Sequence, residues 1–244
     1  VYDGPAAGDT IEIEGIQPWS HAAPVLYHAV LTLRDADGVL QEVVPYDIGF
    51  RRFEMINGVM CLNGERVVFN GVNRHEWNAD RGRAIGADDM HAAMAVFKKN
   101  NINAVRTCHY PDQSLWYDLC DRNGIYMIDE TNLESHGSWQ KLGAVEPSWN
   151  VPGSLPEWKD CVVDRARSMF ERNKNHAAVL IWSCGNESYA GEDILAMSQF
   201  FHDHDPGRLV HYEGVFHCRA FDAISDMLHV ILPQALRNII PQIG

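Results

Sequence analysis

The stretch Ala177-Ala-Val-Leu-Ile-Trp-Ser-Cys-Gly-Asn-Glu-Ser188 decides the fold class of this chain. It opens with six apolar residues, too few for a helix, which run directly into Gly185-Asn186-Glu187. Such a run predicts a strand buried on both faces, as in a parallel sheet, with a carboxylate at its carboxyl end. Chemistry in α/β sheets and barrels is done at that end, so Glu187 is a candidate general acid/base. A glutamate that caps the next helix would fit the segment equally well.

The rest of the chain changes from strands alone to strands that alternate with helices. Residues 11–50 predict β-structure, with strands at 11–14, 27–33 and 40–44. The pair Asn63-Gly64 predicts a tight hairpin between strands at 59–62 and 67–69. From there on the pattern predicts βα units, with strands at 67–72, 104–105 and 125–128, a strand that ends at Glu187, and another at 209–212. The predicted helices are at 88–100, 112–122, 157–172 and 192–202, and a sixth strand is predicted at 223–227. We therefore predict an α/β fold with five to six of the eight strands of a TIM (β/α)8 barrel.

Composition describes an ordinary soluble protein and excludes several partners. The 244 residues are 46% apolar and 22% charged, with a net charge of −13. That charge argues against nucleic acid or an anionic membrane as a partner. The six cysteines show neither a CxxC pair nor zinc spacing, which favours a reducing compartment, the cytoplasm. No signal peptide and no apolar stretch of about 20 residues is present, and Val1 is no initiator methionine, so we expect a fragment.

Polar residues cluster directly after each predicted strand of the barrel. These clusters are Asn73–Glu76, Thr107–Tyr110, Asp129–His136, Asn186–Glu187 and His211–Glu213. The carboxyl ends of parallel strands meet at one mouth, so the repetition predicts a single active site there. The chain has no Gly-rich phosphate loop, HExxH or GxSxG motif, which leaves phosphoryl transfer, zinc proteolysis and serine hydrolysis without their usual marks.

Carboxylates, imidazoles and several tryptophans at a barrel mouth suit the hydrolysis of glycosides. That reaction needs one carboxylic acid to protonate the leaving oxygen and a second carboxylate to attack or to activate water. Glu187 is the acid/base candidate. Glu134 and His136, two residues apart in a loop, are candidate ligands of a divalent ion, and oxygen ligands favour Mg²⁺ over zinc. A loop salt bridge or a helix cap would also explain that pair.

Six blocks of the sequence match motifs of one known enzyme family and keep their order: Gly71–Glu76, Asn103–Pro111, Leu115–Arg122, Asp129–Gly137, Arg172–His176 and Ile181–Ser188. Through these blocks the chain resembles the large β-galactosidases of glycoside hydrolase family 2. Family members that act on glucuronides or mannosides share the Asn-Arg-His and His-Tyr-Pro blocks. They usually carry Asn-Glu-Pro at the acid/base and lack the Glu-x-His-Gly block. Both differences favour a β-galactosidase, with a β-glucuronidase as the alternative.

The resemblance implies three segments. Residues 1–53 would be the carboxyl-terminal part of an immunoglobulin-like β-sandwich, and residues 54–227 the amino-terminal part of a catalytic TIM barrel. Residues 228–244 are unrelated to the family and resemble a cytoplasmic loop of amino-acid ABC transporter permeases. With Pro233 and Pro241 in 17 residues, this tail suits neither a membrane span nor a barrel strand.

The resemblance also assigns roles to individual residues. Glu187 would be the acid/base of a retaining hydrolase of β-galactosides such as lactose. It would bind Mg²⁺ together with Glu134 and His136, and the complete enzyme would also use Na⁺. The remaining site residues would contact the sugar: Asn186 would bond the 2-hydroxyl, and His75 and His109 other galactose hydroxyls.

The nucleophile of this family is absent from the 244 residues. It is a glutamate on the seventh barrel strand, in a block that reads roughly Cys-Glu-Tyr-Ala-His, and no such block occurs here. We therefore expect the isolated chain to lack appreciable galactosidase activity. A fragment that needs a second polypeptide is one alternative, and a carbohydrate-binding module is another. The complete enzyme is expected to be a cytoplasmic homo-oligomer.

Overall fold

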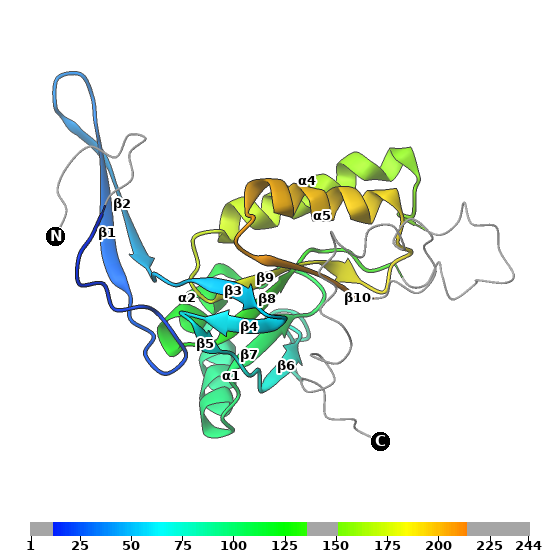
Figure 1. The fold of residues 1–244 in the computed structure, drawn as a ribbon, viewed down its shortest axis with the longest axis horizontal. Coiled ribbons are helices and arrows are strands. Elements are labelled where there is room, and N and C mark those ends of the chain that lie inside the picture. The colour runs from blue at the N-terminus through cyan, green and yellow to red at the C-terminus, as the bar shows by residue number, and fades with distance from the viewer. Residues whose placement is uncertain (1–11, 136–150, 214–244) are drawn as a thin grey trace, which may run out of the picture.

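The core of the molecule is a five-stranded parallel sheet, seen in a computed structural model that describes residues 12–135 and 151–213. The strand order is β10-β9-β8-β7-β6 (Figure 1). The strands are β6 (Gly71–Arg74), β7 (Ala104–Thr107), β8 (Tyr126–Glu130), β9 (Val179–Asn186) and β10 (Leu209–Glu213). Within the described residues, the strands are connected by the helices α1 (Ala87–Lys99), α2 (Ser114–Asn123), α4 (Pro156–Asn173) and α5 (Glu192–His204). This is five-eighths of a (β/α)8 barrel, as predicted; the expected sixth strand at 223–227 lies outside the described residues.

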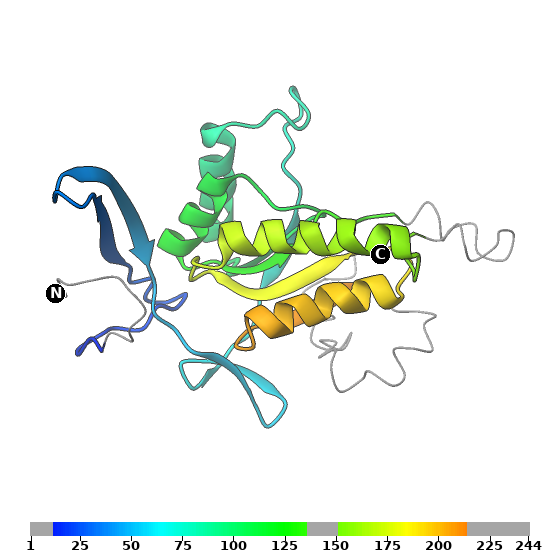
Figure 2. The same cartoon turned by 90° about the horizontal axis from the view of Figure 1, so that it is seen from above.

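Helices pack in neighbouring pairs against the sheet. The helix α4 lies beside α5 near β9 and β10, and α1 lies beside α2 (Figures 1 and 2). All eight residues of β9 are buried, as the apolar run predicts for a strand covered on both faces. Its Trp182 ring stacks on Phe201 of α5, with centroids 5.5 Å apart and planes 4° apart. Ile194 and Met197 of the same helix are also fully buried, a spacing that puts them on the face toward the sheet.

Gly124 ends α2 and returns the chain to the sheet. Its φ of 68° is the left-handed conformation that glycine adopts without strain. A Cβ atom on Gly124 would lie 2.7 Å from the carbonyl oxygen of His21, so the close approach of the amino-terminal segment also requires glycine. Trp19 reinforces this contact, because its buried indole N–H donates to the carbonyl of Asp121 at 2.8 Å.

A small antiparallel sheet precedes the barrel. It consists of β3 (Phe53–Ile56), β4 (Val59–Leu62) and β5 (Glu65–Arg66). Asn63 and Gly64, with φ of 54° and 87°, form the predicted tight turn between β4 and β5. The second strand of this hairpin is wrong in its bounds: it covers 65–66 instead of 67–69. The barrel strand likewise begins at Gly71 instead of Val67, because the chain leaves β4 to pair in parallel with β7.

The amino-terminal part contains one long hairpin, β1 (Tyr27–Arg34) paired with β2 (Leu40–Ile48). Several apolar side chains along it are exposed: Val30, Leu31, Leu33, Val39, Leu40, Val43 and Tyr46. That is typical of strands taken from a sandwich. The predicted strand at 11–14 is wrong, because Glu12 and Ile13 are irregular and a turn follows at Glu14. An alternating pattern needs a partner strand, and residues 12–14 pair with none in the described structure.

Arg51 joins the amino-terminal part to the barrel. Its guanidinium donates to the carbonyl oxygens of Ala177 and Val179, at 2.6 and 2.5 Å, at the start of β9. Among the residues that the structure describes, no helix combines the length and the apolar character that crossing a bilayer needs.

Candidate active site

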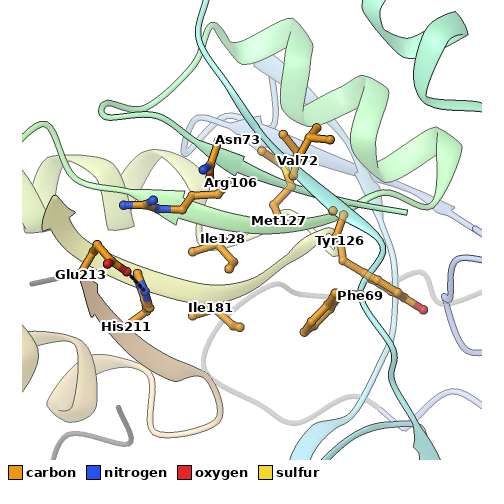
Figure 3. Close-up of a pocket in the computed structure, with 13 residues that line it drawn as sticks. Phe69, Val72, Asn73, Arg106, Tyr126, Met127, Ile128, Ile181, His211 and Glu213 are labelled. Atoms are coloured by element: carbon orange, nitrogen blue, oxygen red, sulfur yellow. Dashed lines mark ion pairs between the residues drawn. The ribbon is translucent and has the colours of Figure 1, made fainter. Parts of the chain in front are cut away.

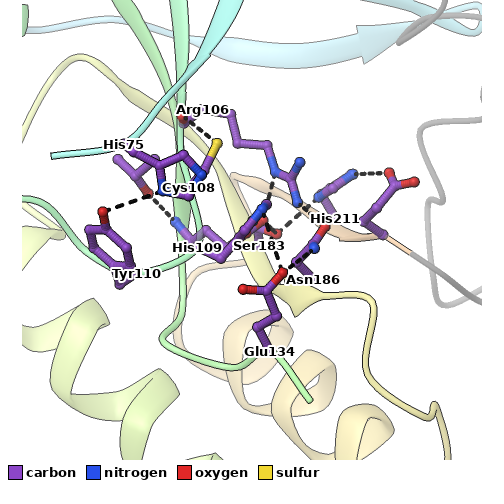
Figure 4. A network of polar contacts seen from close by, with 12 residues as sticks. His75, Arg106, Cys108, His109, Tyr110, Glu134, Ser183, Asn186 and His211 are labelled. Atoms are coloured by element: carbon purple, nitrogen blue, oxygen red, sulfur yellow. Dashed lines mark hydrogen bonds and ion pairs between the residues drawn. The ribbon is translucent and has the colours of Figure 1, made fainter. Parts of the chain in front are cut away.

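A layer of polar side chains, among them Arg106, Ser183 and His211, crosses the carboxyl end of the sheet (Figure 4). Glu130 lies at the centre of its hydrogen bonds. Glu130 ends β8 and is fully buried. Its carboxylate accepts hydrogen bonds from Arg106 Nε at 2.7 Å, His109 Nδ1 at 2.6 Å and Ser183 Oγ at 2.7 Å. The hydroxyl of Ser183 also lies 2.9 Å from Nδ1 of His211. The carboxylate thus has a counter-charge and three donors, the condition under which a buried charge is tolerated.

The charges of this layer shift the pKa values of its members. Burial alone would raise the pKa of Glu130, but the hydrogen bond from His109 and the charge of Arg106 outweigh it and hold that pKa below its usual range. The pKa of His75 is lowered, first by burial and then by the neighbouring His109. An ionised Glu130 keeps a proton on Nδ1 of His109, which leaves Nε2 as the nitrogen with a lone pair.

Arg106 extends the layer to Asn186 and Glu134. Its Nη2 donates to Oδ1 of Asn186 at 2.9 Å, and Nδ2 of Asn186 donates to Oε1 of Glu134 at 2.9 Å. The backbone of Glu134 also forms a parallel bridge with Asn186. Both ends of the amide are therefore fixed, and its second N–H can donate to a ligand.

Glu187 directly follows β9 and is held through its backbone. Its N–H donates to the carbonyl oxygen of Glu213 at 3.0 Å, and its φ is +36°, a rare conformation for any residue but glycine. The helix α5 begins at Glu192, after Gly191, so the interpretation of Glu187 as a helix cap is wrong. Backbone strain of this kind is found mainly where a site requires it.

A cavity of about 370 Å³ opens beside this layer. His75, His109, Tyr110 and Glu134 line part of it, and the volume is sufficient for a sugar. The rings of His75 and His109 meet edge to face with centroids 5.4 Å apart. A second hollow lies on the inner face of the sheet, where the side chains are mostly apolar (Figure 3). That hollow reaches the polar layer through Arg106 and His211, whereas the first cavity borders the candidate residues His75, His109 and Glu134.

The structure brings most of the predicted site residues to one edge of the sheet. His75, His109 and Glu134 share the cavity, and Asn186 is bonded to Glu134 and precedes Glu187. His136 lies outside the described residues. Arg106 and Glu130 were missed as site residues. An arginine inside the buried strand 104–107 signals a buried partner of opposite charge, and the adjacent Asp129 and Glu130 are the two candidates that the sequence offers.

The described part of the proposed metal site has the donors that Mg²⁺ prefers. Glu134 and Glu187 would provide carboxylate oxygens, and the backbone of Glu134 is bridged to that of Asn186, the residue before Glu187. The donor set thus fits a hard divalent cation as far as it is described.

Comparisons with known proteins identify the family of the chain. The TIM barrel domain of glycosyl hydrolases family 2 matches residues 53–238, and a second domain of the same family matches residues 3–51. A β-galactosidase of Halalkalibacterium halodurans is 63% identical over 209 residues, which are 86% of this chain and 21% of that protein. A β-galactosidase large subunit of Lactobacillus acidophilus is 56% identical over 91% of this chain and 36% of its own length.

A solved structure from the same family shares the fold. The crystal structure of a family 2 β-galacturonidase from Eisenbergiella tayi superposes with a TM-score of 0.70 at 25% identity, covering 84% of this chain and 35% of that one. The chain spans 21% to 36% of the length of these relatives. From the matched domains and the shared barrel, the chain belongs to glycosyl hydrolases family 2.

Proposed function

We propose that this chain supplies the acid/base half of a retaining β-galactosidase site. The observation that carries the proposal is the bonded series Arg106–Asn186–Glu134, which fixes an amide next to Glu187 at the mouth of the barrel. The identities of 54–63% to proteins named β-galactosidases support galactosides as the substrate class. The glucuronidases are structural neighbours at about a quarter identity, so the glucuronide alternative has less support.

In the proposed reaction, Glu187 donates a proton to the leaving oxygen and later accepts one from water. Asn186 donates its second N–H to the 2-hydroxyl, a bond that strengthens in the transition state. His75 and His109 border the cavity and bind further hydroxyls. Nε2 of His109 accepts a hydrogen bond from a sugar hydroxyl, because Glu130 holds the proton on the other ring nitrogen. A second carboxylate, from the part of the enzyme that carries the family's nucleophile, completes the reaction.

A magnesium ion held by Glu134, His136 and Glu187 would supply positive charge that tunes the charge and position of the acid/base. The requirement for Na⁺ in the complete enzyme is likewise a proposal.

The complete enzyme is proposed to contain further copies or subunits. Several relatives are named large subunits, which supports a site completed by a second polypeptide. A cytoplasmic location is supported by Cys61, Cys108, Cys120, Cys161 and Cys184, which are all free thiols.

The test supplies the missing carboxylate in trans. The purified chain is mixed with the remaining barrel segment of a β-galactosidase, and hydrolysis of nitrophenyl β-galactoside and β-glucuronide is followed with Mg²⁺ present. We expect galactoside turnover that Glu187→Gln lowers about 10²- to 10⁴-fold. The matched control is His91→Ala, an exposed residue of α1. Preferred turnover of the glucuronide, or full activity of the Glu187 variant, would contradict the proposal.

A further inference from the structure

Three potential metal ligands gather beside the cavity, apart from the carboxylates of the magnesium site. They are His75, Cys108 and His109, and one ring nitrogen of each histidine and Sγ of the cysteine all lie within 4.8 Å of one another. His75 follows β6, and the other two residues follow β7, so adjacent strand ends bring them together. Two imidazoles and a thiol are the donors that zinc-class ions prefer, and that Mg²⁺ avoids.

The second observation is how His109 is held. Its Nδ1 is 2.6 Å from Oε1 of the buried Glu130, so Nε2 faces away from Glu130 and lies 3.8 Å from Oε1 of Glu134. A carboxylate that orients a histidine in this way is the usual outer partner of a metal-binding imidazole. Without such a carboxylate, a cluster of histidine and cysteine could be explained by side-chain packing. Here Glu130 already fixes His109 in the tautomer that binds a metal.

The distances require only a modest adjustment. With metal–sulfur and metal–nitrogen bonds of about 2.3 and 2.0 Å, ligand atoms in a tetrahedral site lie about 3.5 Å apart. The present separations of up to 4.8 Å must therefore close by roughly 1 Å. His75 is exposed and borders the cavity, so its ring can turn toward Cys108, which is buried.

We propose that His75, Cys108 and His109 form a binding site for a zinc-class divalent ion, with the fourth ligand position open to the cavity. On binding, Sγ of Cys108 exchanges its proton for the metal, and the proton leaves to solvent. The site goes beyond the proposed galactosidase function. Since the same two histidines are proposed to bind galactose, the ion and the sugar would exclude each other.

Co²⁺ is the probe, because its absorption reports the ligands and needs no enzymatic activity. The full chain, kept reduced and in excess Mg²⁺, is titrated with Co²⁺. We expect visible bands of a tetrahedral ion and a near-ultraviolet thiolate-to-cobalt band, both lost on addition of Zn²⁺. Cys108→Ser should remove the thiolate band, and His75→Ala should weaken binding at least about tenfold.

Matched control variants remove a thiol or an imidazole at a position away from the proposed site. Cys161→Ser takes away an exposed thiol of α4, and His91→Ala an exposed imidazole of α1; both should keep the bands and the affinity. His75 is exposed, so its variant should fold even if the buried Cys108 substitution does not. Absence of a thiolate band in the parent chain, or a band and an affinity unchanged in His75→Ala, would overturn the proposal. Neither result depends on galactoside turnover.

Discussion

Replacing Glu130 with glutamine tests the central contact of the polar layer. The substitution keeps the shape of the side chain but removes its charge. Arg106, whose side chain is only 10% exposed, then loses its counter-charge, and one of three donors now meets an NH₂ group. Removing one partner of a buried ion pair costs about 3–5 kcal/mol. Because the three hydrogen bonds share one acceptor group, their individual losses do not add to that figure.

The assay is urea unfolding of the chain at neutral pH, followed by tryptophan fluorescence. We expect Glu130→Gln to lower the free energy of unfolding by about 3–5 kcal/mol with an unchanged m-value. Glu42→Gln, on the exposed surface of β2, is the control and should stay within about 0.5 kcal/mol of the parent. A loss for Glu130→Gln of less than about 1 kcal/mol would refute the reasoning, because a pair that loses so little is not desolvated.

The parent and Glu130→Gln should also differ in how their stability falls at acid pH. The pKa of Glu130 is lower in the folded chain than in the unfolded one. Its contribution is therefore fully present above the unfolded pKa and is lost as pH falls through the folded pKa. Glu130→Gln should lack this part of the acid loss, and an identical acid profile in both proteins would contradict the assignment.

Three further substitutions give independent tests. Burial raises the pKa of Asp129 to about 6. Its contribution to stability is therefore present below the unfolded pKa and is lost as pH rises through about 6. In urea titrations between about pH 4 and 7, the free energy of unfolding of the parent should fall by up to roughly 3 kcal/mol from this group, and Asp129→Asn should remove that fall. Gly185→Ala should lower the melting temperature, because φ is +140° and a Cβ would lie 2.6 Å from the carbonyl of Leu133; strain alone costs about 1–3 kcal/mol. Leu33→Ser, at 59% exposure, should change stability by less than about 0.5 kcal/mol and reduce self-association on size exclusion; a larger loss would mean that the hairpin is packed.

The barrel was predictable because its strands and helices carry strong local signals. The apolar run before Glu187 identified β9, and the turn signal Asn63-Gly64 identified the hairpin before the barrel. The equivalent pair Asn57-Gly58, with φ of 51° and 78°, turns the chain between β3 and β4 and was overlooked, although the same rule applies. Strand ends such as Val67 were misplaced because pairing partners, not local propensity, decide them.

The site was predictable at the strand ends and not beneath them. His75, His109 and Asn186 follow strands, and family motifs mark them. Glu130 lies below them and is fully buried. Its role depends on contacts with Arg106 and Ser183, which are 24 and 53 positions away in the sequence. A single sequence shows that Arg106 needs an anion but does not show which one. Asp129 and Glu130 are adjacent, and they differ only in the face of the sheet toward which each side chain points.

The polar layer also has a consequence for how the strands find their alignment. A strand such as β9, apolar on both faces, would bury as much surface if it slid by one residue. Such a slip would turn Ser183 away from Glu130 and leave a buried carboxylate short of a donor, and the same holds for Arg106 on β7. The register of four strands is thus fixed by the polar contacts of Arg106, Glu130, Ser183 and His211. Misaligned sheets are penalised by the same groups that form the polar layer at the carboxyl end of the sheet.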